Sequence, residues 1–216
     1  MPMTSTALSR VYLAGGLCGL TGVVCYVVVI TVSMGVVPTF LLAILWPIGS
    51  IMFCYSLYRL IASEIDSALN QVSFIMAALA FVIVAQMISV QLAVNVGSEE
   101  ILRSASNEES GKLIRRMVRL VDMGLDVAWD VFIGTALVLV AIPRRHNSHL
   151  GIWWSIPAAI LGVLLLVLNI LTFPWPPDSR NLFDVGPFVG VYIFALSGRI
   201  LNLGLRGWKS ASVRLP

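Results

Sequence analysis

Six stretches of this 216-residue chain are apolar and long enough to cross a membrane as helices. A span needs about 20 predominantly apolar residues, because the hydrocarbon core of a bilayer is about 30 Å thick. The pattern predicts spans at Val11–Met34, Thr39–Leu60, Val72–Val96, Leu120–Ile142, Ile152–Phe173 and Pro187–Leu205. These stretches take up nearly the whole chain. We therefore expect an all-α fold, an integral membrane bundle of six transmembrane helices forming one domain over residues 1–216.

The longest polar stretch between the predicted spans is Gly97–Gly111, which we expect to be a loop. It contains Ser106-Asn107-Glu108-Glu109, a capping-box pattern typical of a helix start. The fourth helix should therefore begin well outside the membrane. Its first section, Lys112–Arg119, is basic and amphipathic and is expected to face solvent or lipid headgroups.

The first span is rich in small residues, with Gly15, Gly19 and Gly22 separated by three or two positions. Small residues at such spacing let a second helix approach closely. The approaching helix can belong to the same chain or to a second copy in a homodimer. The sequence favours packing within the chain and leaves the homodimer open.

The composition supports the membrane assignment and sets an orientation. Hydrophobic residues make up 58% of the chain and charged residues only 12%, against about 25% charged in a soluble domain. The net charge of +3 is too small and too dispersed for a nucleic-acid footprint, so no nucleic-acid partner is expected.

Seven basic residues lie on the side of the two termini: Arg10, Arg59, Arg144, Arg145, Arg206, Lys209 and Arg214. Five lie on the other side: Arg103, Lys112, Arg115, Arg116 and Arg180. Because cytoplasmic loops carry more Lys and Arg, both termini are predicted to be cytoplasmic.

Three carboxylates lie on one face of the predicted fourth span. Asp122, Asp126 and Asp130 are four residues apart, and Arg119 falls on the same face. An Asp at the centre of a bilayer costs roughly 2.5–3.5 kcal/mol on insertion scales. These side chains must therefore face protein, water or a bound cation.

Other spans offer polar side chains at comparable depth. Gln91 and Asn95 on the third span and Asn169 on the fifth are candidate partners of the acidic site. Arg199 on the sixth span is the candidate that compensates the charge of Asp130, because each alone would be costly in a bilayer. With Arg119 and Arg199 in the site, one carboxylate is left without a fixed partner and should hold a proton or recruit a cation.

Asp130 is the innermost acidic residue on this face of the helix. Further inward, the same face carries the apolar residues Ile133 and Leu137. This favours a vestibule entered from the outer side over a continuous pore along the helix. Asp126 and Asp130 are the deeper pair, one turn apart, and should share a proton or a cation. The same carboxylates can instead lock helices together or dock a partner subunit.

The chain lacks the common catalytic signatures. It has no Gly-rich phosphate loop, no His-Glu-x-x-His and no Gly-x-Ser-x-Gly. We therefore expect no cofactor and no catalytic residues, and the identity of any metal is left open. A lipid-modifying enzyme with an Asp as general base remains an alternative without a supporting signature.

Three short segments in the C-terminal half carry a family resemblance. They are Asp126-Val-Ala-Trp-Asp130-Val-Phe, Asn169-Ile-Leu-Thr-Phe-Pro174 with Pro176-Pro177, and Asp184-Val-Gly-Pro187. In these segments the chain resembles bacterial six-helix integral membrane proteins of unknown function. The resemblance implies a bacterial inner-membrane location and suggests that Asp130, Asn169 and the Pro-rich loop belong to one feature.

The sequence thus predicts a multi-pass membrane protein with an acidic intramembrane site. The leading functional hypothesis is that this site binds or transports a cation, a proton or a small cationic solute. The second is that the protein is a non-catalytic structural or accessory subunit, or an assembly factor, of a larger membrane complex.

Overall fold

The computed structural model describes residues 5–65, 67–104 and 108–212, with side chains at 6–65, 67–94, 97 and 109–209. The described residues form six α-helices and one short 3-10 helix, and no strand. The helices are α1 (Ser5–Thr31), α2 (Val36–Ala62), α3 (Ala68–Ser104), α4 (Glu108–Arg144), α5 (Gly151–Thr172) and α6 (Gly186–Ser212), with η1 (Pro177–Arg180) between α5 and α6. The all-α fold predicted from the sequence is confirmed.

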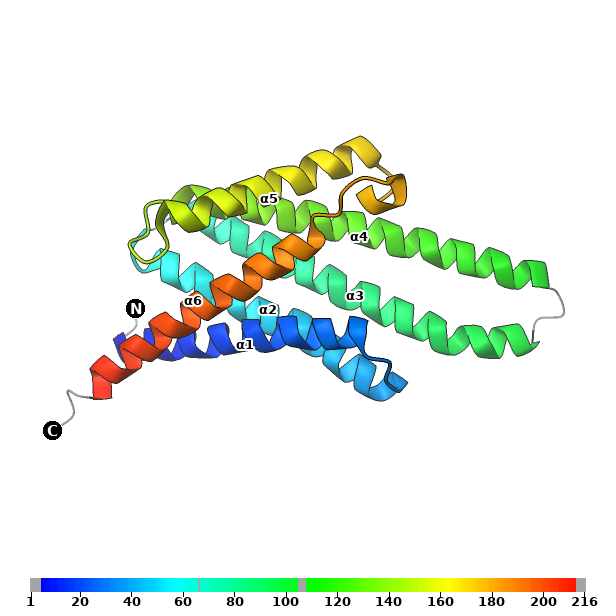
Figure 1. Ribbon diagram of the computed structural model, residues 1–216, viewed down its shortest axis with the longest axis horizontal. Helices are drawn as coiled ribbons and strands as arrows, with labels where there is room; N and C mark the ends of the chain where they lie inside the picture. Colours follow the sequence, from blue (N-terminus) through cyan, green and yellow to red (C-terminus); the bar gives the residue numbers. More distant parts are fainter. Residues whose placement is uncertain (1–4, 66, 105–107, 213–216) are drawn as a thin grey trace.

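The helices are packed in the order α6, α1, α2, α3, α4, α5, each against its neighbours in that series. α1 lies between α2 and α6, whereas α5 packs mainly on α4 and touches α6 only slightly. The start of α1 and the end of α6 lie at one end of the bundle, together with the α2–α3 and α4–α5 connections (Figure 1). The loop that contains η1 lies toward the opposite end. We call that opposite end the distal end.

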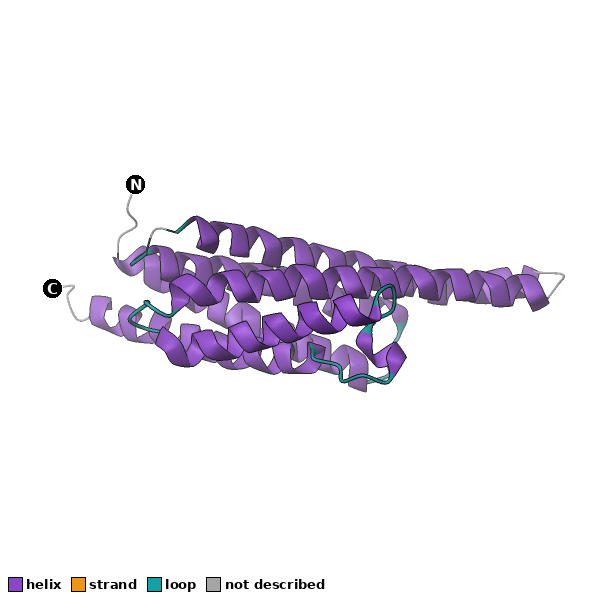
Figure 2. Ribbon diagram, turned by 90° about the horizontal axis from the view of Figure 1, so that it is seen from above, coloured by secondary structure: helices purple, strands orange, loops and turns teal. Residues whose placement is uncertain are grey.

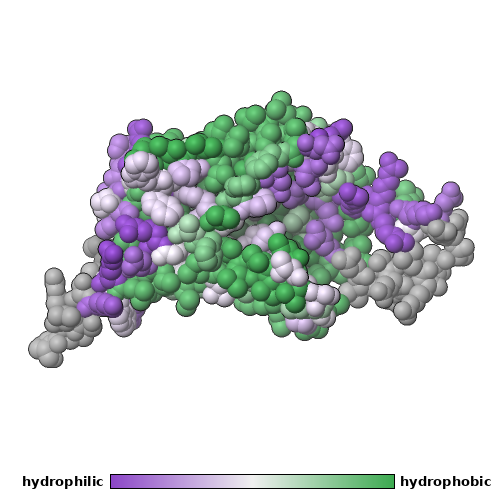
Figure 3. All heavy atoms as spheres, in the orientation of Figure 1, coloured by the Kyte–Doolittle hydropathy of each residue, from purple (hydrophilic) through white to green (hydrophobic). Residues whose placement is uncertain are grey.

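All six helices are long and apolar enough to cross a membrane. Apolar residues cover the middle of the molecule, and hydrophilic residues gather toward its two ends (Figure 3). Large apolar side chains are widely exposed around the bundle, for example 74% of Ile170 and 68% of Val191. Such exposure is stable only in lipid. The chain is therefore a multi-pass membrane protein.

The polar loop predicted at Gly97–Gly111 is wrong, because α3 continues to Ser104 and α4 begins at Glu108. Each of these helices has 37 residues, a length of about 55 Å at 1.5 Å per residue. Together they form an antiparallel hairpin that extends beyond the other helices (Figure 2). The segment was polar, which suggested a loop, but its Glu, Leu and Arg residues also favour helix. The capping residues Ser106 and Asn107 lie outside the described residues.

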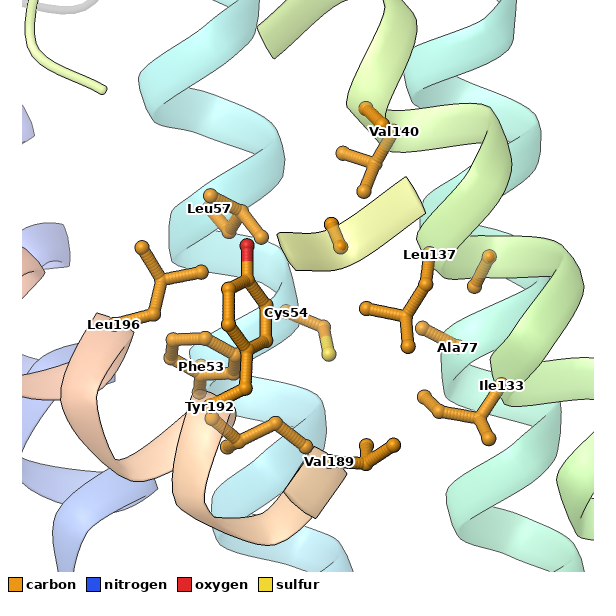
Figure 4. Close-up of a cluster of buried hydrophobic side chains, with 14 of the residues drawn as sticks. Phe53, Cys54, Leu57, Ala77, Ile133, Leu137, Val140, Val189, Tyr192 and Leu196 are labelled. Atoms are coloured by element: carbon orange, nitrogen blue, oxygen red, sulfur yellow. The ribbon is translucent and has the colours of Figure 1, made fainter. Parts of the chain in front are cut away.

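The apolar core lies at the centre of the bundle, between α2, α3, α4 and α6. Side chains from these helices meet there, including Phe53, Ala77, Leu137 and Leu196, each at most 8% exposed (Figure 4). This core separates the distal end of the bundle from the end that carries the termini.

The glycines of α1 pack against helices of the same chain. A Cβ at Gly22 would lie 3.1 Å from the carbonyl oxygen of Trp46 in α2, and one at Gly16 would lie 2.5 Å from the backbone nitrogen of Leu201 in α6. The closest approach of an added Cβ to backbone atoms across the α1–α2 contact is at Gly49, where it would lie 2.5 Å from the carbonyl oxygen of Cys18. Packing within the chain, favoured by the sequence, therefore accounts for this series of small residues.

Gly49→Ala should destabilise the bundle, because its methyl group would push α1 away from α2. Overpacking of this kind costs roughly 1–3 kcal/mol, and thermal unfolding in mild detergent would measure it. Gly198→Ala is the matched control, since nothing lies within 4 Å of a Cβ at that position. Equal melting temperatures for the two variants would contradict the close α1–α2 contact.

Candidate functional site

The centre of the candidate site is a buried hydrogen bond between α4 and α5. The Asn169 Nδ2 group donates to Asp130 Oδ2 at 2.7 Å and to the carbonyl oxygen of Leu165 at 2.9 Å. Asp130 is 4% exposed and Asn169 is 2% exposed. Asn169 lies three residues before the end of α5, so the pair is about one helical turn inside the distal end of that helix. The sequence had named both residues as candidates, and the structure brings them together.

The α5–α6 loop adds two carboxylates that the sequence reasoning did not include. Asp178 and Asp184 lie close enough to Asp126 and Asp130 to interact with them electrostatically. The loop is held in place by its own hydrogen bonds: Asp178 Oδ1 accepts from the Ser179 amide at 2.7 Å, and Asp184 Oδ1 accepts from the Gly186 amide at 2.8 Å. Asp184 lies in the Asp184-Val-Gly-Pro187 segment, the signal that could have identified it.

No Lys or Arg forms an ion pair with Asp126 or Asp130 within the described part of the chain. Arg119 is exposed and lines a separate groove, described below, with Arg116 and Arg180. The carboxylates of the site are therefore left without the compensating cations that the sequence suggested.

The expected pairing of Arg199 with Asp130 needs correction. The Arg199 guanidinium donates to the carbonyl oxygen of His149, with Nη2 at 2.8 Å and Nε at 3.3 Å. His149 lies before the start of α5, at the opposite end of that helix from Asn169. α6 starts at the distal end with Gly186, so Arg199, thirteen residues later, is about 20 Å further along the bundle.

Of the other residues predicted for the site, Asp122 lies at its edge and Gln91 lies beyond it. Asp122 is half-buried, and its Oδ1 is buried without a hydrogen-bond partner. A hydrogen bond of 2.8 Å from Ser73 Oγ to the Ala136 carbonyl sets the register of α3 against α4. By that register Gln91 lies at about the level of Val118, beyond Asp122 and away from Asp130. The side chain of Asn95 lies outside the described residues.

Two further buried polar atoms near the pair have no hydrogen-bond partner in the structure. They are Asn169 Oδ1 and Trp129 Nε1. Trp129 neighbours Asp130 in α4, and a Cβ at Gly186 would lie 3.7 Å from its ring and 3.1 Å from Asp184 Oδ1. The site therefore offers a free acceptor and a free donor beside its carboxylates. Among the described residues, no group of three or more His, Cys, Asp or Glu side chains is arranged to hold a metal ion.

The face of α4 that carries Asp126 and Asp130 becomes apolar toward the end with the termini. Ile133, Leu137 and Val140 follow on this face and are at most 6% exposed. Figure 4 shows all three in the central core, with Tyr192 of α6 in the same cluster. The acidic site is thus closed on that side by packed apolar side chains.

Arg144, counted in the sequence among the basic residues on the side of the termini, is completely buried. It donates to the hydroxyl of Tyr192 and, at 3.4 Å, to the carbonyl oxygen of Trp154. Arg144 continues the helical face of Ile133, Leu137 and Val140, and this periodicity is the signal that could have placed it inside. Arg144 therefore does not count among the exposed basic residues from which the orientation of the chain in the membrane is predicted.

The chemistry of the site follows from this geometry. Four carboxylates lie near one another, two of them on an exposed loop and one fully buried, and no fixed cation balances them. A positively charged group would first meet the exposed carboxylates of Asp178 and Asp184 at the distal end. It would reach Asp130 last, because Asp130 is the buried member of the group. No nucleophile with an adjacent base is present among these residues.

Comparisons of the chain with known protein families, with characterised proteins and with solved structures found no match. The resemblance to bacterial six-helix membrane proteins therefore stays a prediction. The function has to be inferred from the site itself.

Asn169→Leu should destabilise the protein, because it leaves the buried Asp130 carboxyl group without its donor. Leaving a buried polar group unsatisfied costs roughly 1–3 kcal/mol. Thermal unfolding in detergent should show that the double variant Asp130→Leu/Asn169→Leu is more stable than Asn169→Leu alone. Strictly additive losses would mean that the two side chains do not interact.

Proposed function

We propose that this multi-pass membrane protein binds, and moves across part of the membrane, a cation, a proton or a small cationic solute. The acidic site formed by Asp126, Asp130, Asn169 and the loop residues Asp178 and Asp184 takes up the positive charge. A buried carboxylate is costly without a partner, and a bound cation or proton removes that cost.

One observation carries this proposal. Asp130 is buried against Asn169, while the other groups that act on it electrostatically are the carboxylates of Asp126, Asp178 and Asp184. If the site were only a structural lock between helices, a guanidinium or ammonium group would be expected opposite Asp130. The amide of Asn169 orients the carboxylate without neutralising it, which suits a site that gains and loses a positive charge.

Access is proposed to be from the distal end only. Asp178 and Asp184 are exposed there, whereas Ile133 and Leu137 close the opposite side. Release toward the other side would require the central core to open, as in alternating access.

We further propose that the membrane is a bacterial inner membrane with both termini in the cytoplasm and the distal end outside. With Arg144 buried, six of the seven basic residues on the side of the termini remain, against five on the distal side. Arg199 adds to the first group, because its guanidinium reaches the His149 carbonyl next to the α4–α5 connection. Arg119, exposed in the distal groove, adds to the second, so the count is seven against six.

A second function is favoured by the α3–α4 hairpin. α4 exposes apolar side chains along its distal section, among them Leu113 (59%), Met117 (60%) and Val121 (53%). On a hairpin that extends beyond the other helices, such side chains suit contact with another protein. The protein would then be an accessory subunit or assembly factor of a membrane complex.

Asp130→Asn tests the first function. The substitution keeps the shape of the side chain while removing its charge. In the native protein, Na⁺, K⁺ or choline that binds the site should raise stability by about 2.7 kcal/mol at one hundred times its Kd. Addition of the cation should also release protons into weakly buffered solution if the two compete for Asp130. Both effects should disappear in Asp130→Asn.

Glu64→Gln is the control for this experiment, since Glu64 is a carboxylate near the end that carries the termini, where it accepts from the Ser148 amide at 2.7 Å. Its substitution should leave both responses unchanged. A native protein that responds to no cation, releases no proton and purifies with a stoichiometric partner would support the second function instead.

Cysteine labelling tests the orientation. In a background with Cys18, Cys25 and Cys54 replaced, Ser110→Cys on the hairpin should react with a membrane-impermeant maleimide in intact cells. Ser148→Cys, in the α4–α5 connection, should react only after the membrane is opened. Both serines are exposed, so the reverse pattern would place the acidic site on the cytoplasmic side.

A further inference from the structure

A second polar feature of the distal end is a groove between α4 and the α5–α6 loop. It has a volume of about 430 Å³ and is lined by Arg116, Arg119, Leu120, Met123, Trp175, Ser179 and Arg180. Ligand pockets typically have volumes of about 300–1,000 Å³. The groove therefore has room for a small ligand or a lipid headgroup.

Residues from the two sides of the groove are in direct contact with one another. The hydroxyl of Ser179 in η1 approaches Met123 Sδ of α4 at 3.7 Å. The Arg180 guanidinium stands over the ring of Trp175, 5.6 Å from its centroid. Arg116, Arg119 and Met123 are three and four residues apart and so project from one side of α4. The centre of this side is turned from the centre of the Asp126–Asp130 face by only about 30° at 100° per residue, but its residues lie three to fourteen positions nearer the distal tip of α4.

The groove has an excess of positive charge. Within the described part of the chain, none of Arg116, Arg119 and Arg180 forms an ion pair with a carboxylate. Two acidic residues adjoin the groove lining in sequence. Asp178 uses its carboxylate to accept the Ser179 amide, and Asp122 forms no ion pair within the described residues. Three guanidinium groups in one groove are the arrangement that recognises phosphate, because each offers a planar set of N–H donors.

The position of the groove points to a lipid as the source of that phosphate. α5 ends at Thr172 and α6 begins at Gly186, so the groove residues of α4 lie beyond the ends of both helices. That is the level at which headgroups are expected. Leu120 and Met123 add apolar lining. Val131, three turns further along α4 toward the membrane centre and on the Leu120 side, is also exposed. A free phosphate ion would use only the arginines.

We propose that this groove binds the phosphate of an anionic lipid headgroup in the leaflet at the distal end. The acyl chains run from the groove toward the membrane centre, past Leu120 and Val131 of α4, and Arg119 and Arg180 clamp the phosphate from two different elements. This site is distinct from the acidic site, takes a ligand of opposite charge, and does not depend on the function proposed above.

The test uses the full-length protein in mixed micelles of detergent with dioleoylphosphatidylglycerol, dioleoylphosphatidylcholine or no lipid. Thermal unfolding reports binding, because a ligand of the folded state raises the melting temperature. The anionic lipid should raise it at mole fractions at which the zwitterionic lipid and sodium phosphate do not. Arg119→Gln and Arg180→Gln should each raise the half-saturating amount of anionic lipid about tenfold, the effect of losing one charge-assisted hydrogen bond.

Arg115→Gln is the matched control, an exposed arginine of α4 that does not line the groove. It removes the same charge and should leave the lipid response unchanged. An equal response in Arg115→Gln, Arg119→Gln and Arg180→Gln, or none in the native protein, would overturn the proposal. A stabilisation by sodium phosphate equal to that by the anionic lipid would also overturn it and assign the groove to a soluble phosphate compound.

Discussion

Polar groups inside a bilayer have no water to satisfy them, and this constraint determines how α4 is placed in the bundle. One face of α4 carries Asp126 and Asp130 toward the distal end, Arg144 at its last residue, and apolar residues between them. The structure turns this whole face inward. There Asn169 donates a hydrogen bond to Asp130, and the Tyr192 hydroxyl accepts one from Arg144. α5 packs along α4, and the α5–α6 loop brings its carboxylates beside this face.

The consequence is a bundle with two separate buried polar centres. Asp130 and Arg144 are fourteen residues apart on one helix, about 21 Å by helical rise. The apolar core of Ile133, Leu137 and Val140 lies between them, so the opposite charges do not neutralise each other at short range. The proposed cation uptake depends on exposed carboxylates at the distal side of this site and packed apolar side chains on its other side.

The two proposed sites of the distal end have opposite charge and lie on overlapping sides of one helix, at different levels along it. Asp126 interacts electrostatically with the α5–α6 loop carboxylates, whereas Arg119 lines the groove with Trp175 and Arg180. The sequence alone places Arg119 in the acidic site, because Arg119 lies only about 20° from Asp126 on a helical wheel. A long Arg side chain can reach sideways from its Cα, and the loop that meets it decides where its charge is used.

The sequence alone determined the all-α fold and the six spans, because helix formation is local and the thickness of the bilayer sets the length of each apolar run. It also identified Asp130 and Asn169 as costly polar residues needing partners. Tertiary structure alone decided that these two meet, that Arg199 contacts His149 instead, and that Asp178 and Asp184 join the site. It also decided that Arg144 is buried and that Gly97–Ser104 extends a helical hairpin. These outcomes depend on which helix faces pack together. The packing is decided by contacts between residues far apart in the chain, and a local sequence pattern does not contain that information.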